Sequence, residues 1–167
     1  SAHDVEIKRF LIEELAIVGK QEVVVPVMKY ALDHELSSMA TKVLLTVATP
    51  EVAEGYMELL EDAKADSLTT VIQALGDLRA KKAVDAILKH AESADSQLRM
   101  TALCALSSIA DEKAIPVFQK AVASGKPLEL AKARAYALLL ARNLANDGKK
   151  EAAAGVARDL MEKTVKD

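Results

Sequence analysis

The potentially reactive side chains of this 167-residue chain are not spaced for catalysis or metal binding. His3, His34 and His90 lie far apart in the sequence, outside any HExxH motif or cluster with metal-ligand spacing. Cys104 has no motif beside it that would activate a nucleophile, and the sequence lacks a P-loop, a GxGxxG motif and a nucleophile elbow. We therefore expect no catalytic residues, no cofactor and no metal, and we expect the protein not to be an enzyme.

Charged residues that recur at a fixed interval are better candidates for a binding surface. The interval is about 31 residues, and within each copy the charges are three, four or seven positions apart, which places them on one face of a helix. Their sign changes from acidic in the second copy of the repeat to basic in the fourth. The predicted partner-binding residues are Glu51, Glu54, Glu58, Lys82, Asp85, Lys89, Lys113 and Lys120.

This charged face has two interpretations. In the functional one, it is a groove of changing sign that guides a protein or peptide partner of mixed charge. In the structural one, the face is solvated, and Glu51–Lys82 and Glu58–Lys89 are ion pairs between copies that contribute little to stability. The two interpretations differ in whether the charges bind a partner or only form ion pairs with one another.

The composition indicates a folded, helical chain. Hydrophobic residues make up 51% and charged residues 28%, but aromatics only 3%, so the core must consist of small aliphatic contacts. A net charge of −3 disfavours a nucleic-acid partner. One cysteine excludes an internal disulfide, and no apolar run reaches the ~20 residues that span a bilayer. Because the chain begins with Ser1, we expect it to be a segment of a longer protein.

An internal repeat supplies the elements that position these charges. In the segment 98–123, apolar residues at helical spacing predict two helices, Asp111 predicts the cap between them, and Pro116 predicts the opening turn of the second. Shifting this unit back by the same interval, once and twice, aligns apolar with apolar residues in both helices. The aligned positions are Ala40, Val43, Leu44, Val47, Val52, Ala53 and Tyr56, then Val71, Ala74, Leu75, Leu78, Ala83, Val84 and Ile87, then Ala102, Ala105, Leu106, Ile109, Ala114, Ile115 and Phe118.

The two end units match this register less well. The first needs a shift of about 29 residues, and Glu14 then falls in a core column, which a terminal repeat tolerates. Pro26 favours a helix opening over a strand for the valines at 23–25. In the last unit, Asn-Asp-Gly at 146–148 predicts a turn. The predicted core residues are Leu11, Leu15, Val18, Val23, Val24, Val27 and Met28 in the first unit, and Ala137, Leu140, Ala141, Leu144, Ala153, Val156 and Leu160 in the last.

The predicted fold class is all-α, a right-handed α-α superhelix of about five antiparallel helix pairs. One pair cannot bury both of its apolar faces, so the pairs must stack. We expect a single domain over 1–167, with units at about 4–33, 36–63, 67–93, 96–124 and 129–164. The expected first helices are 4–18, 36–48, 67–78, 96–109 and 129–145, and the expected second helices are 22–33, 51–63, 81–93, 112–124 and 149–164.

The segments 68–88 and 98–118 resemble the short HEAT repeats called phycobilisome-lyase HEAT-like repeats. The matching residues are Ala-Leu-x-x-Ile at 105–109, Asp111, Ala-Ile-Pro at 114–116 and the basic residue Arg99. The resemblance is clear over 67–124 and weaker at both ends. It implies a solenoid of the HEAT or armadillo kind, in which second helices line the concave side, and it implies no particular activity.

Two functions of different classes follow. The first is a non-catalytic protein-interaction or scaffold module that binds a partner of mixed charge on the concave second-helix face. The alternative is an enzyme built on HEAT-like repeats, such as an alkylpurine DNA glycosylase-type nucleic-acid enzyme, whose site would need aromatic, carboxylate and basic residues in a positive groove. The absence of Trp, the two Phe residues and the negative net charge disfavour this alternative, so we expect no nucleic-acid partner.

Overall fold

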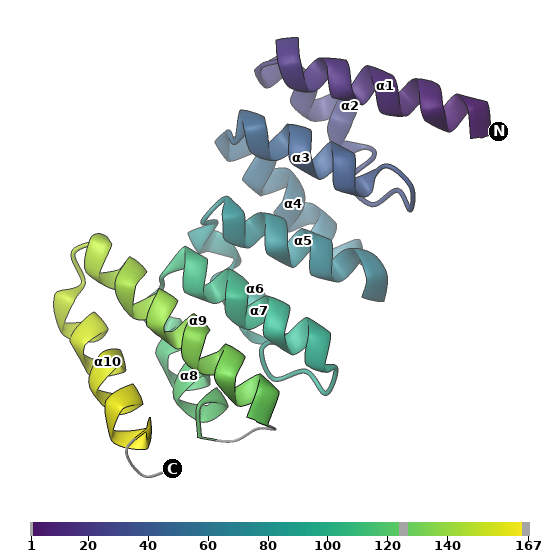
Figure 1. Cartoon of the computed structure of the whole chain (residues 1–167). Helices are drawn as coiled ribbons and strands as arrows, with labels where there is room; N and C mark the ends of the chain where they lie inside the picture. The colour runs from purple at the N-terminus through teal and green to yellow at the C-terminus, as the bar shows by residue number, and fades with distance from the viewer. Residues whose placement is uncertain (1, 124–126, 165–167) are drawn as a thin grey trace. The chain divides into compact units, whose positions relative to one another are not determined.

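The structure, a computed structural model, describes residues 2–123 and 127–164, and the regular elements of these residues are all helices. They form two compact units, an N-terminal unit up to Leu78 and a C-terminal unit from Arg79 (Figure 1). The prediction of an all-α helical repeat is confirmed. The N-terminal unit contains α1 (Ala2–Val18), η1 (Gln21–Val23), α2 (Val24–Met28), α3 (Ser37–Val47), α4 (Pro50–Asp62) and α5 (Ala65–Asp77). The C-terminal unit contains η2 (Lys81–Ala83), α6 (Val84–Leu88), α7 (Ser96–Ile109), η3 (Glu112–Ala114), α8 (Ile115–Ala121), α9 (Pro127–Asn146) and α10 (Lys150–Thr164), where η marks a 3-10 helix.

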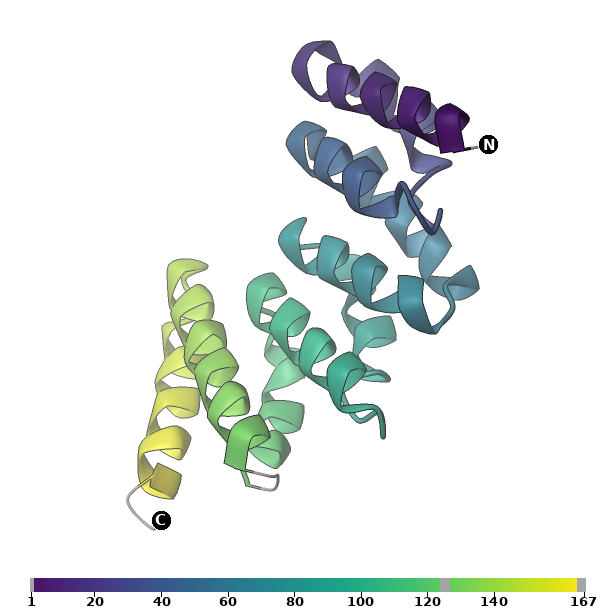
Figure 2. The ribbon, with the colours of Figure 1, turned by 45° about the vertical axis from the view of Figure 1, so that its right-hand side comes forward.

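Each unit has two layers of helices. In the N-terminal unit, α1, α3 and α5 lie side by side in one layer, and α2 and α4 form the other (Figures 1 and 2). In the C-terminal unit, α7 packs against α9, and α8 contacts α10. Within each unit, the first helices of the pairs therefore share one layer and the second helices the other, as stacked helix pairs require.

Burial confirms the repeat register. Ala40, Leu44 and Tyr56 in the N-terminal unit are fully buried, as are their equivalents in the C-terminal unit, Ala102, Leu106 and Phe118. The margins of the apolar stripe are half-buried, as at Val47, Leu78 and Ile115. The predicted core of the last helix pair is also buried: Ala137, Leu140, Ala141, Leu144, Ala153, Val156 and Leu160.

Three second helices are shorter than predicted. The expected helix over 22–33 ends as α2 at Met28, and the expected helix over 81–93 ends as α6 at Leu88. After each, a backbone N–H bonds the carbonyl three residues back, as in Tyr30 N to Val27 O at 2.9 Å. Such bonds tighten the chain into turns and leave the α-helical path. The helix expected over 112–124 begins with η3 and continues as α8 to Ala121, and residue 124 lies outside the described residues.

The buried face of α1 differs from the predicted one. Leu11, predicted as core, is 54% exposed, whereas its neighbour Ile12 is 3% exposed. Leu15 is half-buried, and the side chain of Val18 lies outside the described residues. The prediction at Leu11 was wrong because α1 is apolar on both sides, so spacing alone does not show which side α3 covers. The exposed apolar residues of α1 are Ile7, Phe10, Leu11 and Ile17.

Three first helices end with the same backbone conformation. Ala48, Arg79 and Ala110 have φ angles of 47°, 51° and 58°, follow α3, α5 and α7, and stand one repeat interval apart. The N–H of Ala48 bonds Leu44 O, and that of Ala110 bonds Leu106 O. A left-handed residue here turns the chain from the first helix towards the second. This periodic turn carries no sequence signal, because none of the three residues is glycine.

Candidate functional site

All eight predicted partner-binding residues are exposed and lie on or beside second helices. In the N-terminal unit, Glu51, Glu54 and Glu58 lie on α4. In the C-terminal unit, the other five lie on or next to η2–α6 and η3–α8: Lys82, Asp85, Lys89, Lys113 and Lys120. We predicted that these charges form one face whose sign changes from acidic to basic along the chain. That arrangement stays a prediction.

In the C-terminal unit, exposed charges pair between successive second helices. Lys113 Nζ lies 2.8 Å from Asp85 Oδ2, and Lys120 Nζ lies 2.6 Å from Glu92 Oε1. The hydrogen bond to Asp85 raises the pKa of the Lys113 ammonium. All four side chains are more than half exposed, so these pairs stabilise the fold weakly and can exchange for charges of a partner.

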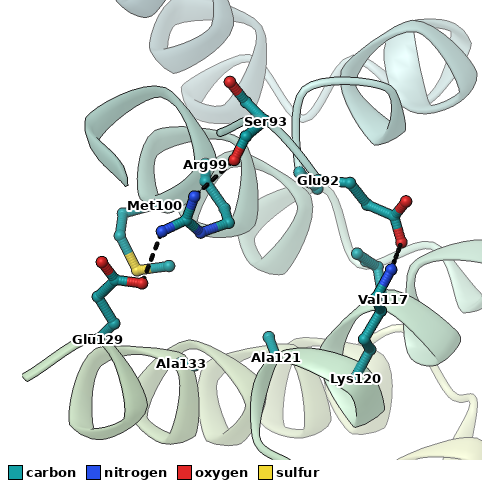
Figure 3. A pocket seen from close by; sticks show the side chains of 10 residues that line it. Glu92, Ser93, Arg99, Met100, Val117, Lys120, Ala121, Glu129 and Ala133 are labelled. Carbon is teal, nitrogen blue, oxygen red and sulfur yellow. Dashed lines mark hydrogen bonds and ion pairs between the residues drawn. The ribbon is translucent and has the colours of Figure 1, made fainter. Parts of the chain in front are cut away.

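A pocket of about 280 Å³ lies between the Glu92–Lys120 pair and the start of α9 (Figure 3). Small and flexible apolar residues line it, among them the buried Ala91, Met100 and Ala133. The Glu92–Lys120 pair stands on one side of the pocket and an Arg99–Glu129 pair on the other (Figure 3). An apolar cavity rimmed by charges is suited to one anchoring side chain of a protein partner.

Arg99 holds the framework of this pocket together. Its Nη2 lies 2.6 Å from Glu129 Oε2 at the start of α9, and its Nη1 donates to Ser93 O at 2.5 Å in the turn after α6. The hydroxyl of Ser96 donates to the other carboxylate oxygen of Glu129 at 2.7 Å. Arg99 thus positions one wall of the pocket rather than offering its charge to a ligand. The sequence columns missed Glu129 because it stands on α9, outside the regular register of the middle units.

A groove lies between α2 and α4 in the N-terminal unit. Its volume is about 450 Å³, and all three predicted acidic residues of this unit line it. Two apolar side chains also line the groove: Val25 is 72% exposed, and Met28 packs against Gly55. A Cβ on Gly55 would stand 2.6 Å from Met28 Cε, so the missing side chain makes room for the methionine. The groove lining is Val24, Val25, Met28, Lys29, Glu51, Glu54, Gly55, Glu58 and Leu59.

The reactive side chains lie in ordinary surroundings. Burial lowers the pKa of His90, as does the nearby charge of Lys89. Cys104 is half-buried next to Tyr136, whose pKa is raised by burial and by the thiol. Within the described ranges, no three His, Cys, Asp or Glu side chains gather to hold a metal ion. Every described helix is too short or too polar to cross a membrane.

Comparison with protein families matches residues 53–139, more than half of the chain, to the family described as HEAT repeats. The matched region runs from α4 into α9 and includes all residues that line the pocket in the C-terminal unit. No curated protein matches the chain. The predicted resemblance is confirmed at the level of HEAT repeats.

Proposed function

Because the chain belongs to the HEAT-repeat family, we propose that it is a non-catalytic interaction module that binds a protein or peptide on its second-helix face, the concave face of such repeats. HEAT repeats are generally protein-interaction scaffolds. The observation that supports this site is that exposed charges on the second helices border a hollow lined with apolar residues in each unit. Such hollows offer the desolvated anchor points on which binding energy concentrates.

The charged rims favour a partner of mixed charge. Lys113 and Lys120 in the C-terminal unit are paired with Asp85 and Glu92 in the free protein, so a partner must bring both signs to replace both members of a pair. Exposed charges act mainly on encounter rate and specificity. We therefore expect binding to weaken as salt rises to physiological strength, where the Debye length is about 8 Å.

We also propose that the repeats are of the phycobilisome-lyase HEAT-like type. Two matching residues have structural roles that support this subtype. Arg99 ties the turn after α6 to α9, and the Asp111 carboxylate caps η3 by accepting the Lys113 N–H at 2.9 Å. Both roles concern the repeat architecture, so the subtype adds no activity.

The test is selection from a random-peptide display library on the immobilised chain. Selected peptides should bind K82E/K89E/K120E about tenfold more weakly than wild type, a loss of about 1.4 kcal/mol. The matched control, K8E/K42E/K132E, changes the net charge equally at exposed lysines on first helices and should bind as wild type does. Circular dichroism and thermal melting check that each variant is folded.

Two results would overturn the proposed function. The first is a library that yields no peptide with specific binding. The second is a set of selected peptides whose binding changes neither in K82E/K89E/K120E nor when Glu51, Glu54 and Glu58 are replaced by Gln. Retention of the chain on duplex DNA at moderate salt would instead favour the alternative, a glycosylase-type enzyme acting on nucleic acid.

A further inference from the structure

We propose that the α2–α4 groove of the N-terminal unit binds an amphipathic basic segment of a partner protein, with aliphatic side chains in the groove and Lys or Arg against Glu51, Glu54 and Glu58. This inference rests on the proposed interaction function. It adds the place of a site and the chemistry of the partner.

The three glutamates form a row along the groove. They stand three and four residues apart on α4, so they share one helix face, and all three are exposed. From Glu51 to Glu58 the row is roughly 10 Å long, at about 1.5 Å per helical residue. That length matches two turns of a partner helix with basic residues at the same spacing.

The charge of the groove selects a basic partner. Three carboxylates line it against one ammonium, that of Lys29. A hydrogen bond from its own backbone N–H lowers the pKa of Glu51, as does a hydrogen bond with the Thr49 side chain. An acidic peptide or a nucleic acid would be repelled, whereas a basic segment is drawn to the groove.

The apolar part of the groove is exposed and adaptable. Val25 projects 72% of its surface to solvent, and the half-buried Met28 and Leu59 line the space beside it. Methionine adjusts its shape to different aliphatic partners because its side chain is unbranched and flexible. The absence of a side chain at Gly55 leaves room for Met28 to move, because a Cβ there would clash with the end of the methionine.

A second copy of the chain does not fit the groove as well. In a two-fold contact the same patch faces itself, so the glutamate rows would meet and repel. The groove therefore calls for a partner of opposite charge rather than for self-association.

The test uses a fluorescent peptide of leucine and lysine, about 14 residues long and roughly 21 Å as an amphipathic helix. Fluorescence anisotropy at low salt should show saturable binding to the full chain. Binding to E51Q/E54Q/E58Q should be weaker by about tenfold or more. The control E6Q/E13Q/E151Q removes three exposed carboxylates elsewhere and should bind as wild type does. A peptide with Glu in place of Lys should not bind.

Two further measurements separate the apolar contact from the charges. V25S alters a side chain that is mostly in solvent, so it leaves the fold intact and should weaken the peptide about threefold to tenfold. A peptide of the same composition, scrambled so that it has no apolar face, should bind wild type about threefold to tenfold more weakly than the ordered peptide does. Equal binding of the ordered and scrambled peptides would overturn the amphipathic part of the proposal.

The failure of this proposal differs from failure of the proposed function. Equal binding of the peptide to both glutamine triples would overturn the groove assignment. The groove assignment would also be overturned if the leucine–lysine peptide did not bind wild type while display-selected peptides bound it and lost affinity in K82E/K89E/K120E. Absence of both kinds of binding would overturn the interaction function itself.

Discussion

At the scale of single residues, Leu106 tests the repeat register. It is fully buried, and its equivalents one and two repeats earlier, Leu75 and Leu44, are buried leucines too. Leu106→Ala should lower the free energy of unfolding by ~2–5 kcal/mol, through lost burial and the cavity left behind. Denaturant titration measures this. Leu138→Ala, at a leucine that is 58% exposed on α9, should change it by less than about 0.5 kcal/mol. A similarly small loss at Leu106 would contradict the register.

Tyr56 gives the structure a response to alkaline pH. Its ring is fully buried on α4 and its hydroxyl donates to Thr41 Oγ1 at 2.7 Å, and burial raises its pKa from 10.0 to about 12. The folded state thus holds this proton more tightly than the unfolded state. The resulting stability is complete below pH 10 and declines as pH rises towards 12. Urea titrations at several alkaline pH values should show a shallower decline for Tyr56→Phe than for wild type. Equal slopes would mean that Tyr56 ionises normally.

At the scale of elements, the left-handed residues that end α3, α5 and α7 carry backbone strain. A residue with a Cβ is disfavoured at positive φ, and Ala48 has φ 47° at an exposed site. Ala48→Gly should therefore raise the free energy of unfolding by ~0.5–1 kcal/mol. Ala131→Gly, at an exposed site inside α9, should lower it by ~1 kcal/mol. Thermal and denaturant unfolding would contradict the turn assignment if both glycines were destabilising.

The cap of α7 is a second element that can be tested. Asp95 Oδ1 accepts the N–H groups of Gln97 at 2.7 Å and Leu98 at 3.1 Å, which would otherwise lack helical partners. Asp95→Ala should lower the free energy of unfolding by ~0.5–2 kcal/mol. Asp95→Asn keeps an acceptor at this position and should recover most of that loss. If alanine and asparagine behave alike, the carboxylate does not cap the helix.

At the scale of the whole molecule, charge predicts how the chain treats nucleic acid. The net charge is −3, and the charged residues that line the α2–α4 groove are three carboxylates and one ammonium. The chain should therefore pass through a heparin or duplex-DNA column at about 0.15 M salt without retention, because binding to phosphates requires a surplus of Lys and Arg. A K82E/K89E/K120E column run should be indistinguishable from wild type. Retention of wild type that this variant abolishes would show a basic patch strong enough to overcome the net charge.

The sequence by itself determined the helical fold and the position of its core. Apolar residues at helical spacing, repeated at a fixed interval, predict which side of each helix is buried, and Leu44, Leu75 and Leu106 are each fully buried. It also placed the charged residues on exposed faces of second helices, because positions outside the apolar stripe face solvent.

Only the tertiary structure decided which of these surfaces form sites. The partner of Arg99 is Glu129, thirty residues away, and the lining of the α2–α4 groove joins Glu51 to Val25 and Met28. The covered side of α1 likewise depended on where α3 packs, which left Leu11 exposed and Ile12 buried. Periodicity fixes the direction of a side chain around its own helix. It does not fix how neighbouring helices are offset along and around one another, and that offset determines which side chains meet.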